Sequence, residues 1–169
     1  QRVLLMDFLR TIAGPTVEQV RRLAVRLQLN GCTIDVLHPL LCLHSRLANL
    51  ELLQSKRMGN GPAQARWMVD ITKAYLKDMV VQKQAPDEVA KACRFIAELV
   101  EFKSGKYCFL EFSMDALASV PDEAVNYAGD RFAHQELPRT LERIQKRRSA
   151  WLAYRARAAQ HVRGANESG

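Results

Sequence analysis

A leucine-rich segment in the first third of the chain constrains the fold more than any other feature. Eight leucines fall within it: Leu37, Leu40, Leu41, Leu43, Leu47, Leu50, Leu52 and Leu53. On an α-helix these leucines cover more than one face, which is typical of a buried helix. We expect a central helix that either kinks at Pro39 or begins there, after a short turn over residues 34–38. Leu40, Leu43, Leu47 and Leu50 then form the centre of the core.

Helical periodicity extends over most of the other residues, and glycine, proline or small polar residues mark each junction. Helices are predicted over residues 3–13, 17–29, 39–53, 62–84, 86–103, 107–112, 121–135 and 138–163. The fold class is therefore all-α, an irregular bundle of seven to eight helices with a long basic C-terminal helix. We expect a single domain over residues 1–163 and a flexible tail over residues 164–169.

Two of these segments carry more specific expectations. Residues 107–112 have a strand-like composition, but the chain offers no strand of matching character to pair with them, so a helix is favoured. Strand content should be negligible. In the helix over residues 62–84, the large apolar side chains are expected to face the core; they are Trp67, Met68, Ile71, Tyr75 and Met79.

Composition limits the class of protein. The 169 residues are 48% hydrophobic and 25% charged, which is typical of one ordinary soluble domain. No run of about 18 apolar residues occurs, so we expect no membrane insertion. The four cysteines include no C-x-x-C pair and no export signal precedes them, which favours free thiols and an intracellular location, in cytoplasm or nucleus without distinction.

Catalytic and phosphate-binding motifs are absent from the sequence. His38 and Cys42 are four residues apart and His44 is near, but this segment is so apolar that core packing is favoured over a metal or thiol-imidazole site. Two carboxylate pairs, Glu98 with Glu101 and Glu111 with Asp115, are interpreted as solvated surface. We expect no catalytic activity, no metal and no organic cofactor.

Positive charge is concentrated at the C-terminus. Residues 139–169 hold eight basic and two acidic residues, and so carry +6 of the formal net charge of +7. On the helix over residues 138–163 one third of the circumference is apolar and forms the expected packing face: Leu137, Leu141, Ile144, Trp151, Leu152, Ala158, Ala159 and Val162. Most of the cations lie on the other side, in a stripe about 27 Å long: Arg139, Arg143, Lys146, Arg147 and Arg157, with His161. Arg148 and Arg155 fall inside the apolar face.

Three interpretations of this helix remain open. It can bind nucleic acid, RNA or DNA, with seven cations on phosphates and Trp151 and Tyr154 stacked on bases; the cations are Arg139, Arg143, Lys146, Arg147, Arg148, Arg155 and Arg157. It can dock on an acidic protein or a neighbouring subunit, including a second copy of the chain. It can also be a solvated outer face. We predict a non-catalytic binding or assembly module, with a protein-interaction scaffold and a helical enzyme with dispersed residues as the alternatives.

A second, weaker anion site is suggested by the loop over residues 55–61. Lys56 and Arg57 supply positive charge there, and Gly59 and Gly61 permit a close backbone approach to a phosphate. A plain connection between two helices explains the same residues.

Overall fold

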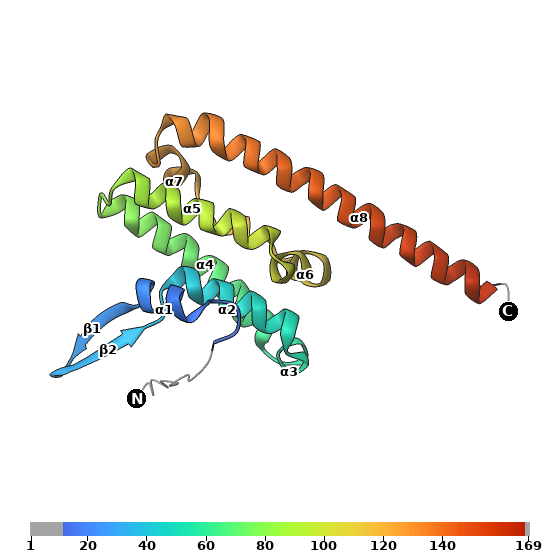
Figure 1. Ribbon diagram of the computed structural model, residues 1–169, viewed down its shortest axis with the longest axis horizontal. Helices are drawn as coiled ribbons and strands as arrows, with labels where there is room; N and C mark the ends of the chain where they lie inside the picture. The colour runs from blue at the N-terminus through green and yellow to red at the C-terminus, as the bar shows by residue number, and fades with distance from the viewer. Residues whose placement is uncertain (1–11, 168–169) are drawn as a thin grey trace.

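The computed structural model describes residues 12–167, and side chains as far as Gln160. The element order in this range is α1 (Val17–Leu23), β1 (Val25–Leu29), β2 (Cys32–Val36), α2 (Pro39–Leu52), α3 (Gln54–Met58), α4 (Gly61–Val81), α5 (Pro86–Glu101), α6 (Lys103–Phe112), the 3-10 turn η1 (Ala116–Ser119), α7 (Asp122–Tyr127), the π-helical turn η2 (Phe132–Glu136) and α8 (Leu137–Glu167). The fold is an irregular all-α bundle with one small hairpin (Figure 1). The predicted helix over residues 3–13 lies almost wholly outside the described residues.

The leucine-rich helix α2 is the centre of the bundle, as its sequence predicts. Pro39 occupies its first turn, and the Nδ1 atom of His38, the residue before it, accepts a hydrogen bond from the backbone N–H of Leu40. Leu43, Leu47 and Leu50 are fully buried, and α2 packs against α4 and α6. The proline therefore begins the helix and does not kink it.

A β-hairpin replaces the second half of the helix predicted over residues 17–29. Helix α1 ends at Leu23, and β1 and β2 pair antiparallel from Val25 opposite Val36 to Leu29 opposite Cys32. Asn30 and Gly31, which were expected to end the helix, have positive φ angles of 49° and 82° and form the two-residue turn between the strands. The side chains alternate: one face is apolar, with Leu27 opposite Ile34, and the other is polar, with Arg26 opposite Asp35.

Helix α4 presents a different face to the core from the one predicted. Trp67 and Ile71 are exposed, at 64% and 50%, and only Met79 of the five predicted residues is fully inside. The buried positions are mostly smaller: Ala65, Val69, Thr72, Leu76 and Met79. Helix α4 packs against α2, and small buried side chains such as Ala65 and Thr72 permit a close approach of two helices.

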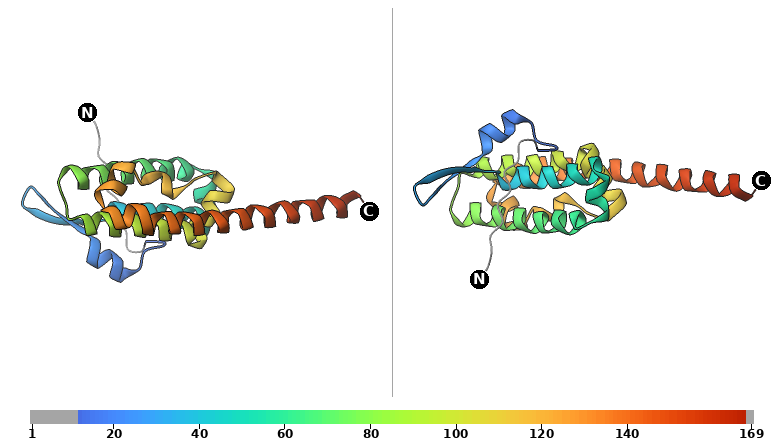
Figure 2. Two further views of the ribbon diagram at one scale, coloured as in Figure 1. Left: turned by 90° about the horizontal axis from the view of Figure 1, so that it is seen from above. Right: turned by 90° about the horizontal axis from the view of Figure 1, so that it is seen from below.

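The second half of the chain builds the other side of the bundle. Residues 107–112 lie in helix α6, as predicted, and the helix expected over residues 121–135 is divided into α7 and the π-helical turn η2. Helix α8 then runs to Glu167, beyond its predicted end at Arg163. Figure 2 shows that the hairpin projects from one end of the molecule and α8 from the other.

Candidate nucleic-acid interface

The first half of α8 lies along the bundle, and the second half extends past it (Figure 1). Ile144 is buried, Leu137 and Trp151 are partly buried, and Leu141 and Leu152 are exposed although they point to the same side. Residues 152–160 are all exposed, Ala158 and Ala159 included; Val162 and His161 lie outside the described side chains. The predicted packing face is therefore used only as far as Trp151.

Two of the predicted nucleic-acid-binding arginines share one carboxylate of the bundle. Arg143 Nη2 lies 3.0 Å from Glu101 Oε2, and Arg147 Nη1 lies 2.7 Å from Glu101 Oε1. Glu101 is the last residue of α5 and only 15% of its side chain is exposed, whereas the side chains of both arginines are about half exposed. One negative charge between two guanidiniums leaves a net positive charge at this point of the surface.

The two arginines inside the apolar face hold α8 against α6 and the segment after it. Arg148 Nη2 lies 2.5 Å from Asp115 Oδ1, its guanidinium carbon lies 4.5 Å from the centre of the Phe109 ring, and only 11% of its side chain is exposed. Arg155 donates to the carbonyl oxygen of Leu110 and pairs with Glu111 at 3.3 Å. Both side chains therefore contact the bundle; Arg148 is largely withdrawn from solvent, whereas half of the Arg155 side chain remains exposed.

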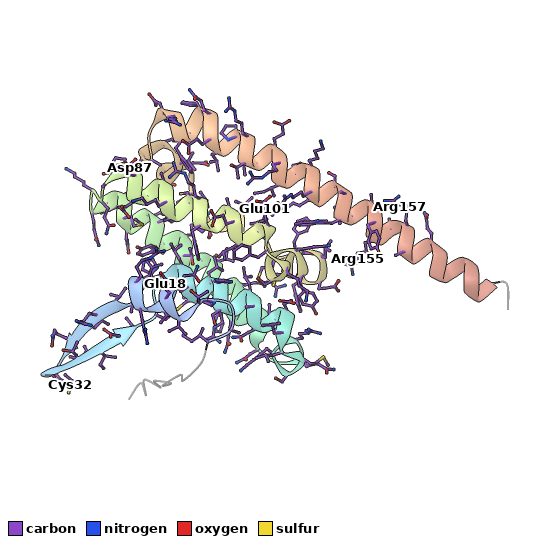
Figure 3. The ribbon with its side chains drawn as sticks, viewed as in Figure 1. Glu18, Cys32, Asp87, Glu101, Arg155 and Arg157 are labelled. Atoms are coloured by element: carbon purple, nitrogen blue, oxygen red, sulfur yellow. The ribbon has the colours of Figure 1, made fainter. Side chains whose placement is uncertain are left out.

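The remaining three cations of the predicted site form a row on the outer face. Arg139, Lys146 and Arg157 are exposed and have no carboxylate partner among the described side chains. They are separated by seven and eleven residues, which at 100° per residue places them within about 20° of one line along the helix. Figure 3 shows Arg157 and Arg155 on different sides of α8, with Glu101 between α5 and α8.

The two aromatic residues proposed to stack on bases lie in different surroundings. Trp151 is partly buried, and the Lys106 ammonium group of α6 lies 5.4 Å from the centre of its ring. Tyr154 is 70% exposed and lies on the part of α8 that extends past the bundle. Tyr154 is therefore open to a base, whereas Lys106 covers Trp151.

The predicted anion loop at Lys56 and Arg57 is a short helix, α3, and Arg57 has a partner within the fold. Its Nε atom donates to the carbonyl oxygen of Leu50 at 2.7 Å, and Nη2 donates to that of Glu51. These two carbonyls belong to the last turn of α2, so Arg57 caps that helix. A Cβ on Gly61 would lie 2.1 Å from the carbonyl oxygen of Lys56, so this glycine permits close packing of α3 and α4.

Among the described side chains, no histidine forms a hydrogen bond with a cysteine. His38 Nε2 lies 2.9 Å from the hydroxyl of Tyr75, and the Cys42 thiol donates to the Leu37 carbonyl at 3.5 Å. Burial raises the pKa of Cys93 to about 11 and that of Cys108 to about 12, which keeps both thiols protonated and unreactive. Within residues 12–167 no group of three His, Cys, Asp or Glu residues is placed to hold a metal ion, and no helix is long and apolar enough to cross a membrane.

Sequence reasoning missed the acidic partners of α8. Glu101, Glu111 and Asp115 were interpreted as solvated surface, yet each one pairs with an arginine of that helix. One signal for them exists in the sequence: Arg148 and Arg155 lie within the apolar face, and a cation on a packing face requires an acidic or carbonyl partner there.

Comparisons of the chain with protein-family models, with curated proteins and with solved structures found no match.

Proposed function

We propose that the protein is a non-catalytic helical binding module whose helix α8 binds nucleic acid, RNA or DNA, along its outer face. The observation that carries the proposal is the row of Arg139, Lys146 and Arg157, which has no carboxylate partner among the described side chains. A phosphate backbone supplies the negative charge that such a row lacks. The four free cysteines support a reducing, intracellular setting.

Arg143 and Arg147 add to this surface without leaving their partner. Both are about half exposed, and they share the single charge of Glu101. A phosphate on the outer side of the helix meets their remaining N–H groups, since a guanidinium has five donors. Arg148 and Arg155 have a different role in this proposal, because they hold the helix on the bundle.

The test is binding of a labelled single-stranded oligonucleotide, RNA and DNA in turn, at about 50 mM salt. We expect four phosphate contacts from the five outward cations, which gives a log-log salt slope of about −3. Changing Arg139, Lys146 and Arg157 together to Glu should abolish binding and leave the melting temperature nearly unchanged, since none of the three contributes to an ion pair with the bundle.

A matched control carries the same change of charge elsewhere. Arg21, Lys73 and Lys83 are exposed cations outside α8, and their replacement by Glu should weaken binding only through the lower net charge. No association of the unmodified protein with oligonucleotide contradicts the proposal. Equal loss of binding in the control variant also contradicts it, because binding then depends on total charge and not on α8.

A second candidate, a scaffold or oligomerisation domain, is favoured by the exposed continuation of the packing face. Leu152, Ala156 and Ala159 follow each other at helical spacing and are exposed beyond the bundle. Because two of these three side chains are small, another helix can pack closely against the stripe. That helix can belong to an acidic protein or to a second copy of this chain. If the oligonucleotide does not bind, sedimentation as a dimer that Leu152→Glu converts to monomer favours this candidate.

A further inference from the structure

One cavity among the described residues has no residue of α8 in its walls. It has a volume of about 520 Å³ and opens between α1, α2, α4 and α5. Leu40, Met79 and Phe95 are among its apolar lining residues, and charged or polar side chains such as His38 and Lys91 line the rest. A concave site of this size with apolar walls and a few polar groups is the usual form of a small-molecule site.

Tyr75 and its hydrogen-bond partner His38 both line this cavity. His38 Nδ1 accepts from the Leu40 N–H at 3.2 Å, so the neutral ring carries its hydrogen on Nε2. Nε2 lies 2.9 Å from the Tyr75 hydroxyl and therefore donates to it. The Tyr75 oxygen therefore accepts a hydrogen bond from His38. The hydroxyl proton of Tyr75 remains available to donate to another group. No acceptor for that proton occurs among the described residues.

Burial favours these protonation states. It lowers the pKa of His38, so the ring is neutral at pH 7. Burial, and next the nearby Glu88 carboxylate, raise the pKa of Tyr75, so its hydroxyl keeps the proton. Tyr75 is consequently a donor over the whole physiological range.

The cavity is lined by two cations, Arg22 and Lys91, and by one carboxylate, Glu88. Lys91 and Glu88 pair with each other at 2.6 Å, so Lys91 offsets part of the Glu88 charge that acts on Tyr75. Arg22 of α1 also lines the cavity and has no carboxylate partner among the described side chains. Among the described side chains, the cavity therefore presents one cation without a carboxylate partner, Arg22, and one neutral donor, Tyr75, beside its apolar lining residues.

We propose that this cavity binds a small monocarboxylate with an apolar body, such as a medium-chain fatty acid or an arylalkanoate. The carboxylate accepts hydrogen bonds from the Tyr75 hydroxyl and the Arg22 guanidinium, and the apolar body lies against Leu40, Met79 and Phe95. This inference goes beyond the proposed function of α8 and does not depend on it.

Titration calorimetry with octanoate tests the proposal, and octanol and octylamine are the matched ligands. We expect saturable binding of octanoate that is at least tenfold tighter than that of octanol, and no saturable binding of octylamine. Tyr75→Phe removes one oxygen atom and should weaken octanoate binding about tenfold or more, because a hydrogen bond to a charged group is lost. Tyr154→Phe, the same change on exposed α8, should have no effect.

Arg22→Gln provides a second variant that does not touch the core. It should weaken octanoate binding about three- to fivefold and leave octanol binding unchanged. Three results would overturn the proposal: no saturable binding of octanoate, equal affinity for octanoate and octanol, or unchanged octanoate affinity in both variants. Since none of these measurements involves α8 or an oligonucleotide, they are independent of the test of nucleic-acid binding.

Discussion

The ring of His44 lies buried in the bundle with its Nδ1 atom unpaired. The ring centres of Phe102 and Phe95 lie 5.4 Å and 6.3 Å from it, and a Cβ on Gly14 would lie 2.9 Å from its Cδ2 atom. Gly14 has a φ angle of 92°, which a residue with a side chain rarely adopts. Burial lowers the pKa of His44, so the folded protein keeps the ring neutral.

This neutral ring predicts a loss of stability on acidification. Below about pH 6.5 the unfolded chain takes up a proton at residue 44 that the folded chain excludes, so the free energy of unfolding falls. The fall is at most about 1.4 kcal/mol per pH unit for one proton. His44→Phe should reduce the pH dependence of the free energy of unfolding, measured by urea unfolding between pH 7.5 and 5.5. Part of the dependence should remain, because burial also lowers the pKa of His38. An unchanged slope would show that residue 44 does not titrate differently on folding.

At the scale of one element, the attachment of α8 depends on polar contacts more than on apolar ones. Ile144 is its only fully buried side chain up to Gln160, whereas Arg143, Arg147, Arg148 and Arg155 all contact carboxylates of the bundle. Attraction between partly exposed charges is screened by salt. The position of α8 should therefore respond to ionic strength more than the leucine core does.

Glu101→Gln tests this attachment. The change removes the charge that Arg143 and Arg147 share, and we expect the free energy of unfolding to fall by about 1–2 kcal/mol at low salt and by less at 1 M NaCl. Glu142→Gln, on the exposed side of α8, is the control and should change it by less than about 0.5 kcal/mol. A loss that is independent of salt would indicate that Glu101 acts through packing and not through charge.

Local signals in the sequence predicted the helices well and the hairpin poorly. Proline at the first turn marks α2 and α5 correctly, because only a helix start tolerates it. Over residues 17–29 the apolar residues fit a helical period of 3.6, and this pattern favoured a helix. The Asn30-Gly31 turn and the alternation of Val25, Leu27 and Leu29 indicated the hairpin that the structure contains. Similarly, the cations of α8 were predicted, but their partners Glu101 and Asp115 lie 42 and 33 residues away, and no local pattern specifies such contacts.

For the molecule as a whole, the core around α2 determines stability. Leu47 is fully buried, and the Cys108 thiol of α6 lies 3.7 Å from its carbonyl oxygen. Leu47→Ala should lower the free energy of unfolding by about 2–5 kcal/mol, because it leaves a cavity between helices. Leu52→Ala removes the same atoms from an exposed position of the same helix and should cost less than about 0.5 kcal/mol. Equal melting temperatures for the two variants would show that α2 is not the centre of the core.

The hairpin packs chiefly against itself, and this has a consequence for how the molecule opens. Its strands make most of their contacts with each other, and Leu27 and Leu29 remain exposed on the apolar face. Breaking the β1–β2 ladder therefore disturbs few interactions of the bundle, whereas separating α2 from α4 disrupts the core. We therefore expect amide hydrogens of Val25–Leu29 to exchange with solvent through local opening, and those of α2 to exchange only when the whole bundle unfolds. Native-state hydrogen exchange should then give two opening free energies for the described part of the chain, a small one for the hairpin and a large one for α2.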